Sequence, residues 1–470
     1  MVPYFPKQIG ARAVLVYLAS LVLVNMFFFR HAMLFGYMVL GVFFVSSFFG
    51  GTYAFSKNWI RIPEERYLRN VFWTAFVFRL VWVIASYYFY IEYTGIPFEF
   101  ATADALGYHE EAKWLASESW LKVWDYYFGP HAVGISDVGY PLYLTIIYRL
   151  FGPVIIIPRI IKALLGALTC ILVYRIASRN FGMEAGRMAG IMCMLMPNLV
   201  IYCGYHLKET EMLFLEVAFL YSMDVLLRDR RISFWNIALT IVLAGSLFFF
   251  RTVLGIAAII AAATGILIVT TPSMRGGWRR TILILFGVLC LVGVSGGTAM
   301  TEVEVLWEQK DDNVVLKRAE QMKRGNQWAT YATGTVMAPM VVVLPFSTMI
   351  NVDQQYSQQT KHGGNFIRNF MGFFALLALV EAIRQRRLRE FAMLGAFVFA
   401  YLGIVSISGF SNSERFLLPG LPVLIMMWAY GVTQLRDKSY HFALPPWCFV
   451  VIAMEFGWAF FKLGSRGLFY

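Results

Sequence analysis

The chain has 470 residues, of which 59% are hydrophobic and only 14% are charged, with a formal charge of +12. Its mean hydropathy is +0.62. A soluble globular protein carries about a quarter charged residues, so this composition excludes an ordinary soluble domain and indicates a surface that faces lipid. The positive charge does not indicate nucleic-acid binding, because the basic residues recur in short clusters between apolar runs instead of gathering in one domain.

Apolar runs long enough to cross a bilayer recur along the sequence and predict an all-α polytopic membrane protein with about thirteen transmembrane helices. The first run lacks a small-residue cleavage site and is interpreted as a retained span rather than a signal peptide. The predicted spans are 11–29, 33–55, 71–93, 154–177, 184–205, 210–227, 233–250, 253–271, 281–299, 365–383, 389–409, 415–435 and 443–462.

Basic residues fall in alternate loops between these spans, which places all of the clusters on one side. The positive-inside rule makes that side cytoplasmic, so we expect a multi-pass protein of the cell inner membrane with its N terminus inside and its C terminus outside. The clusters are Lys57, Arg61, Arg66 and Arg69; Arg175, Arg179 and Arg187; Arg228, Arg230 and Arg231; Arg275, Arg279 and Arg280; Arg384, Arg386, Arg387 and Arg389; and Arg436 with Lys438.

Two long segments then fall on the outer face. The first, 95–153, contains two predicted juxtamembrane helices, 104–120 and 141–151. The second, 301–364, contains a charged helix-like stretch and an apolar stretch that lies in the interface or re-enters the membrane. The cysteines all lie in or beside apolar runs, with no metal-binding spacing, and are predicted to be buried small hydrophobes: Cys170, Cys193, Cys203, Cys290 and Cys448.

Asp104 stands at the start of a helix-like stretch in the first outer segment. Asp at such a position either caps the helix or, at the mouth of a membrane cavity, serves as a general base or metal ligand. His109, Glu110 and Glu111 follow on the same stretch. Consecutive helix positions point to different faces, so at least one of the two glutamates is expected to be solvated.

A very short outer loop near residues 205–211 contains Lys208 and Glu209. Charges this close to two spans are costly in hydrocarbon and tend to face a polar site, although a solvated turn that favours the next helix N-terminus is the alternative. Arg251 and Arg415 stand alone at the outer ends of two later spans, where snorkelling is the alternative, and Glu414 is interpreted as an ion-pair partner of Arg415. One carboxylate with several cations suits transfer from a phosphate-bearing lipid.

This layout resembles the GT-C superfamily of membrane glycosyltransferases, which includes protein O-mannosyltransferases, aminoarabinose transferases and oligosaccharyltransferase catalytic subunits. Two extra spans precede the matching region of roughly 70–435, no large soluble domain follows it, and a single Asp replaces an Asp-x-Asp pair. The matching features are Asp104, Tyr140-Pro141-Leu142 through Leu150-Phe151-Gly152, Arg159, Arg179-Asn180-Phe181-Gly182, Lys208-Glu209, and Arg415-Phe416-Leu417-Leu418-Pro419 with Pro422.

The resemblance implies a GT-C-like fold with two additional helices at 1–70, a catalytic core at 71–299, an outer loop at 300–364 and C-terminal helices at 365–470. It implies an inverting transferase that moves a sugar from a polyprenyl-phosphate donor to a glycan, lipid or protein acceptor on the outer face. Its implied roles are catalysis for Asp104 and Glu209, donor-phosphate binding for Lys208, Arg251 and Arg415, and substrate binding for Tyr108, His109, Glu111 and His206.

Other readings of the sequence remain open. No cofactor is required by the resemblance, and a divalent cation such as Mg²⁺ or Mn²⁺ is left undecided. A polymerase or ligase acting on a lipid-linked oligosaccharide is the nearest alternative enzyme. A transporter or flippase of lipid-linked sugars is the alternative from another class, but the sequence shows no internal repeat and its notable charges cluster at the outer edge.

Overall fold

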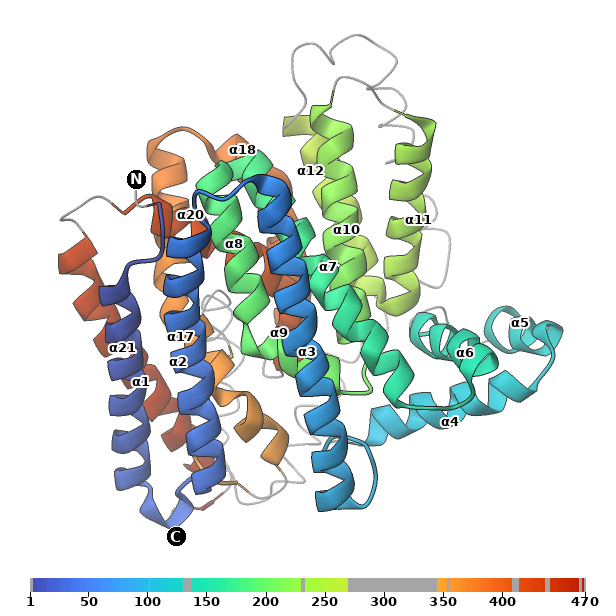
Figure 1. The fold of residues 1–470 in the computed structure, drawn as a ribbon, viewed down its shortest axis with the longest axis horizontal. Coiled ribbons are helices and arrows are strands. Elements are labelled where there is room, and N and C mark those ends of the chain that lie inside the picture. Colours follow the sequence, from blue (N-terminus) through green and yellow to red (C-terminus); the bar gives the residue numbers. More distant parts are fainter. Residues whose placement is uncertain are drawn as a thin grey trace.

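The computed structural model describes residues 3–100, 102–129, 137–229, 233–268, 345–352, 355–407, 414–435, 440–464 and 467–468. Every regular element in these ranges is a helix, apart from an isolated β-bridge between Ala32 and Ile350. Figure 1 shows long helices side by side in a bundle, with short helices lying across its lower end and the two termini at opposite ends. The all-helical prediction is confirmed for the described part of the chain.

Eight helices in the described ranges are long and apolar enough to cross a membrane. They establish a multi-pass membrane protein but not the predicted count of thirteen. The eight are α1 (Lys7–Phe27), α2 (Phe35–Trp59), α3 (Glu64–Thr94), α7 (Ile156–Phe181), α17 (Tyr356–Arg384), α18 (Leu388–Ile407), α19 to α20 (Glu414–Leu417 and Leu421–Thr433, joined by the 3₁₀ turn η6, Leu418–Gly420) and α21 (Tyr440–Gly464).

Three further predicted spans coincide with helices that fall short of this standard. Helix α10 (Glu209–Arg228) carries several acidic residues, whereas α11 (Phe234–Phe250) and α12 (Thr252–Ile268) are apolar but only 17 residues long. The predicted span 281–299 lies outside the described residues, as do 301–344 of the second outer segment.

The predicted span 184–205 is not one straight helix. It comprises α8 (Met183–Leu195), α9 (Pro197–Ile201) and the 3₁₀ turn η2 (Tyr202–Gly204), with a bend of 52° at the break. Pro197 has no N–H to continue the helical ladder. The buried Arg79 guanidinium donates to the freed carbonyls of Cys193 and Met194 at 3.1 and 3.3 Å. The bend therefore directs the following loop, 205–208, to the N-terminus of α10.

The first outer segment forms α4 (Ala103–Ser117), α5 (Trp120–Phe128) and α6 (Gly139–Phe151), which lie across the lower end of the bundle in Figure 1. Helices α4 and α6 were predicted, whereas α5 was not. Ser119 caps α5 by accepting a hydrogen bond from the Lys122 backbone at 3.3 Å. The side chains of Trp120, Leu121 and Trp124 are exposed, which suits a helix lying in a membrane interface.

Helix α17 begins at Tyr356, well before the predicted start at residue 365. Hydropathy missed its first half because that half is polar. The structure nevertheless buries Lys361, His362, Asn365 and Arg368 between helices. Polar groups that are buried at this depth tend to carry function, since lipid offers them no partners.

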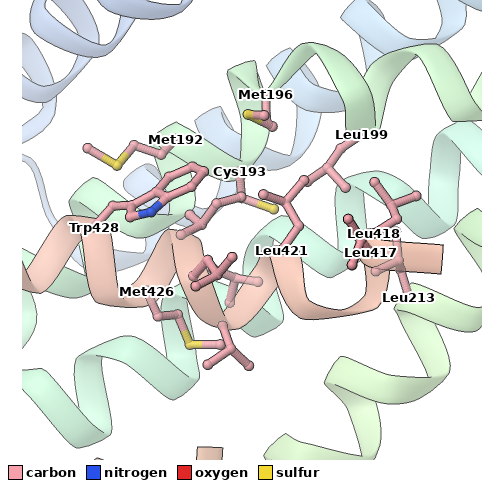
Figure 2. Close-up of a cluster of buried hydrophobic side chains, with 14 of the residues drawn as sticks. Met192, Cys193, Met196, Leu199, Leu213, Leu417, Leu418, Leu421, Met426 and Trp428 are labelled. Carbon is pink, nitrogen blue, oxygen red and sulfur yellow. The ribbon is translucent and has the colours of Figure 1, made fainter. Parts of the chain in front are cut away.

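Helix α20 packs against α8 and α17 in a dense apolar cluster. Figure 2 shows side chains of Leu417, Leu418 and Leu421 gathered with those of Leu199 and Leu213, and all five are buried. Close packing of this kind leaves little freedom for the backbone. It therefore fixes the short helix α19, which carries Arg415 into the site described next.

Candidate functional site

Three chain segments that are far apart in sequence meet at one guanidinium. Asp104 is the second residue of α4, Glu209 is the first residue of α10, and Arg415 is the second residue of α19. Arg415 pairs through Nη1 with the Asp104 carboxylate and through Nε with the Glu209 carboxylate. Thr102, not Asp104, is the N-cap residue of α4. The structure thus brings the two predicted catalytic carboxylates and one predicted phosphate-binding cation into direct contact.

Arg251 is the second cation of this group. It follows the last residue of α11, where the backbone leaves the helix. Its Nη2 lies 3.8 Å from Oε1 of Glu209, its Nη1 donates to the Tyr401 hydroxyl at 3.1 Å, and its Cζ stands 4.6 Å from the Phe416 ring centroid. The other oxygen of Glu209, Oε2, is buried without a hydrogen-bond partner among the described residues. Glu209 therefore retains one acceptor oxygen for a ligand.

Lys208 is the third cation and precedes α10 as its N-cap residue. Its ammonium pairs with Asp137 and donates to the carbonyl of Phe250, the last residue of α11, at 2.8 Å. Burial lowers the pKa of Lys208 to about 6, and the neighbouring Arg251 charge acts in the same direction. Asp137 has a left-handed backbone (φ 71°) and was not predicted, because no motif marks it in the sequence.

The predicted substrate-binding residues separate into two groups. Tyr108, one turn after Asp104 on α4, lies against Arg415 and stacks edge-to-face on Tyr140 at 5.1 Å. His109 turns away, and its Nδ1 is 2.8 Å from the Tyr148 hydroxyl, which is also 3.2 Å from Nε2 of His206. Burial lowers the pKa of both histidines. His109, Tyr148 and His206 thus form a hydrogen-bonded chain that does not include the carboxylates of Asp104 and Glu209.

Two further glutamates lie outside the ion pairs of Arg415, and the substrate-binding role of Glu111 stays a prediction. Glu111 accepts a hydrogen bond from the Tyr127 hydroxyl at 2.9 Å, so it ties α4 to α5 and is not brought to Asp104. Glu414 does not pair with its neighbour Arg415, because adjacent residues of the short helix point in different directions. Its carboxylate instead meets the Lys361 ammonium of α17 at 2.7 Å.

A layer of buried charges beneath the loop 205–208 was not predicted as part of the site. Lys162 of α7 donates to the carbonyl of Tyr205 at 2.9 Å and to that of Leu207, and its ammonium is 3.5 Å from Glu211. The backbone N–H of His206 donates to Glu99 at 3.1 Å. These contacts hold the loop that presents Lys208 and Glu209.

A signal for this layer existed in the sequence. Lys162 lies near Arg159 in the predicted span 154–177, and an ionisable residue inside a span indicates a buried partner. Arg159, named only through the resemblance, lies 3.9 Å from the carboxylate of Glu99. That partner could not be read from the sequence, because nothing in the pattern fixes how residues 95–99 return to α7.

The donor set does not suit the divalent cation that the sequence left open. Within the described ranges no three His, Cys, Asp or Glu side chains come together in a metal-binding arrangement. The two carboxylates that do converge, those of Asp104 and Glu209, are bridged by the Arg415 guanidinium. No step is therefore assigned to a metal.

Comparison with known proteins identifies the segment that carries much of this site. Residues 138–297 match the model of the family described as dolichyl-phosphate-mannose-protein mannosyltransferase. No curated protein matches the chain. The matched segment, about a third of the chain, includes Lys208, Glu209 and Arg251, while Asp104 and Arg415 reach the site from either side of it. Residues 138–297 are therefore similar to this mannosyltransferase family, and this similarity together with the apolar helices supports a membrane glycosyltransferase of the GT-C type.

Proposed function

We propose that the protein transfers a sugar from a polyprenyl-phosphate donor to an acceptor hydroxyl on the outer face of the cell inner membrane, with inversion at the anomeric carbon. The observation that carries this proposal is the guanidinium of Arg415 held between the carboxylates of Asp104 and Glu209. A base and a phosphate-binding cation in direct contact are what an inverting transfer from a phosphodiester donor needs.

The arriving donor phosphate exchanges with Asp104 on Arg415. Asp104 is the accessible partner, with 55% of its side chain exposed, whereas Glu209 is fully buried. Arg415 binds a phosphate oxygen as readily as a carboxylate, since both fit its planar fork of N–H donors. Once displaced, Asp104 accepts hydrogen bonds from the acceptor instead of from the arginine. The donor thereby releases the base that its own reaction requires.

The reaction then balances as a direct displacement. The acceptor oxygen attacks the anomeric carbon as its proton passes to Asp104, and the bond from that carbon to the phosphate oxygen breaks. The leaving polyprenyl phosphate takes the electron pair and gains a negative charge. Arg251 and Arg415 stabilise that charge, and each such preorganised donor is worth roughly 10²–10³ in rate. Lys208 adds to this stabilisation while it is protonated. Glu209 keeps Arg251 and Arg415 together and offers Oε2 to a sugar hydroxyl.

The lower end of the bundle in Figure 1 suits the outer face. The basic α2–α3 and α17–α18 connections lie at the opposite end, where the positive-inside rule puts the cytoplasm. Helix α5, whose Trp120 and Trp124 are exposed, lies at the same end of the bundle as α4, the helix that carries Asp104. A lipid-linked donor that rests in the outer leaflet would meet the site from this side.

The test is transfer of labelled sugar from a polyprenyl-phosphate donor by the purified protein in lipid nanodiscs. We expect Asp104→Asn to lose transfer by about 10²–10⁴-fold, as removal of a general base does. Glu110→Gln is the matched control on the same helix, because the Glu110 side chain is 62% exposed and pairs with Lys113. Release of a polyprenyl diphosphate would instead favour the polymerase or ligase, and movement of intact donor across vesicles would favour the transporter.

A further inference from the structure

The buried first half of α17 carries a stripe of polar side chains that the proposed reaction does not use. Lys361, Asn365 and Arg368 are spaced by four and three residues, so they lie above one another on one face of the helix. All three are buried, with 7%, 5% and 3% of their surface exposed. Burying two cations on one helix face is costly unless each is paired, so the partners of these side chains decide what the stripe does.

Two of these side chains contact the segment that also carries Arg415, and Asn365 is linked to that segment through Asn198. Lys361 meets the Glu414 carboxylate at 2.7 Å, and Arg368 donates through Nη1 to the carbonyl of Leu417 at 3.2 Å. Asn365 accepts a hydrogen bond from Asn198 of α9 at 2.9 Å, and Asn198 also donates to Glu414. Since Glu414 and Arg415 are adjacent, the stripe and the Asp104 site lie on two sides of one short helix.

The charge of the stripe is not balanced. Two cations, Lys361 and Arg368, share the single carboxylate of Glu414. The Nε and Nη2 donors of Arg368 are buried without a hydrogen-bond partner among the described residues. In the Asp104 site, by contrast, Arg415 meets two carboxylates and Lys208 meets a third. A buried arginine with two donors left over is a cost that a bound anion would remove.

We propose that Lys361, Asn365 and Arg368 form a second anion-binding site, which takes a phosphate group of the acceptor while Arg415 takes that of the donor. The two unpaired donors of Arg368 fit two phosphate oxygens, and the Asn365 amide and Lys361 ammonium lie along the same face. The inference rests on the proposed function for its assignment to an acceptor. The acceptor would accordingly be a phosphorylated lipid or glycan, presented next to the base on the other side of α19.

The number of phosphate ligands bound per chain tests this site without relying on sugar transfer. Purified protein in nanodiscs is dialysed against radiolabelled decyl phosphate, and inorganic phosphate is used in parallel. We expect two decyl phosphates per wild-type chain, one for Arg368→Gln, one for Arg415→Gln, and none for the double variant. Preference for decyl phosphate at the Arg368 site assigns a lipid phosphate, whereas equal binding of inorganic phosphate assigns a phosphate without its lipid.

Matched variants keep the outcome clear. Arg384→Gln lies at the far end of the same helix, with 68% of the side chain exposed, and should bind two decyl phosphates. Lys361→Gln provides a second removal if Arg368→Gln does not fold. A wild-type count of one, or an unchanged count in both Arg368→Gln and Lys361→Gln, overturns the second site. Absence of sugar transfer by the wild type would overturn the proposed function while leaving a count of two intact.

Discussion

The two ends of α10 carry similar charges in opposite arrangements. At its C-terminal end Asp224 accepts hydrogen bonds from Arg179 at 2.6 Å, from Asn180 at 3.1 Å and from Arg228 at 2.7 Å. Arg228 is one turn along the same helix, and Arg179 and Asn180 are neighbours on α7. Both Asp224 oxygens are used, so this cluster, the saturated network, locks two helices together and has nothing left for a ligand.

At the N-terminal end of α10, Glu209 belongs to an unsaturated site. Its Oε2 has no hydrogen-bond partner in the described part of the chain, and its partner Arg415 is shared with the half-exposed Asp104. The participants come from α4, α10, α19 and the α11–α12 junction rather than from two adjacent helices. The comparison teaches that residue type does not separate a structural ion pair from a reactive one. The number of unused hydrogen-bonding positions does.

The largest difference between the two ends of α10 is expected in activity, from a substitution at the N-terminal end. Arg415→Gln removes the shared guanidinium, so we expect transfer by folded protein to fall about 10³-fold. Arg415→Lys should recover only part of the loss, because an ammonium cannot bridge two anions with a planar fork. Steady-state rates, normalised to folded protein by size-exclusion chromatography, provide the measurement. Activity of Arg415→Gln within a few fold of wild type would remove Arg415 from the site.

The buried layer below the loop 205–208 should behave as a structural pair. Lys162→Met leaves Glu211 without its cation, and we expect a loss of about 3–5 kcal/mol in unfolding free energy. The double variant Lys162→Met with Glu211→Gln should regain most of that stability, because neither charge is then left alone. It should not regain full transfer, since the carbonyls of Tyr205 and Leu207 still lack their donor. Thermal unfolding and kcat are measured on the same samples.

A substitution in the saturated network should lower stability and leave activity unchanged, which is the reverse of the result expected for Arg415. Asp224→Asn leaves Arg228 without an anion and leaves Arg179 with Asp229 alone, and we expect it to cost about 1–3 kcal/mol of stability. Transfer per folded molecule should stay at the wild-type rate, because Asp224 lies at the far end of α10. A fall in kcat for protein of normal stability would show that the two ends are coupled.

The smallest expected effect is a pH dependence from Lys208. Its pKa lies near 6 in the folded protein because of burial, below the ordinary lysine value, so it is charged below pH 6 and neutral above. The donor phosphodiester keeps its charge across this range. We therefore expect donor affinity to fall by up to about tenfold per pH unit as pH rises above 6. Lys208→Arg, which stays charged, should flatten the profile, and an identical slope in both proteins would contradict this role.

Lys208 also makes the folding stability depend on pH, in the direction opposite to that of donor affinity. Between about pH 6 and the unfolded lysine pKa, the unfolded chain binds a proton at Lys208 that the folded chain lacks. Stability from this group alone therefore rises with pH through that window and is lost as pH falls through 6. Thermal unfolding of wild type and Lys208→Arg at matched pH values measures the difference.

The sequence predicted what depends on hydropathy and charge order. Asp104, Glu209, Arg251 and Arg415 were placed on one face from loop charges alone, and all four are linked by direct ion pairs. What it missed depends on burial of polar groups. The polar start of α17 was assigned to a loop because hydropathy cannot distinguish a buried polar helix from a solvated segment. The Pro197 break in the predicted span 184–205 was overlooked because apolar content stays high across it.

The sequence also did not indicate which charged residues pair with each other. Asp137, Glu99 and Lys361 contribute to ion pairs whose second members lie more than fifty positions away. Helical periodicity reports only neighbours three or four residues apart, so it could not indicate that Lys361 pairs with Glu414. The interpretation that Glu414 pairs with Arg415 rested only on their adjacency in the sequence.

The central claim is that the donor phosphate takes the place of Asp104 on Arg415. It is tested most directly by measuring donor affinity and kcat together for Asp104→Asn. The account predicts that donor Kd is unchanged or lower, because the competing carboxylate is gone, while kcat falls by about 10²–10⁴-fold. A higher donor Kd in this variant, or sugar transfer at the wild-type rate, would contradict it.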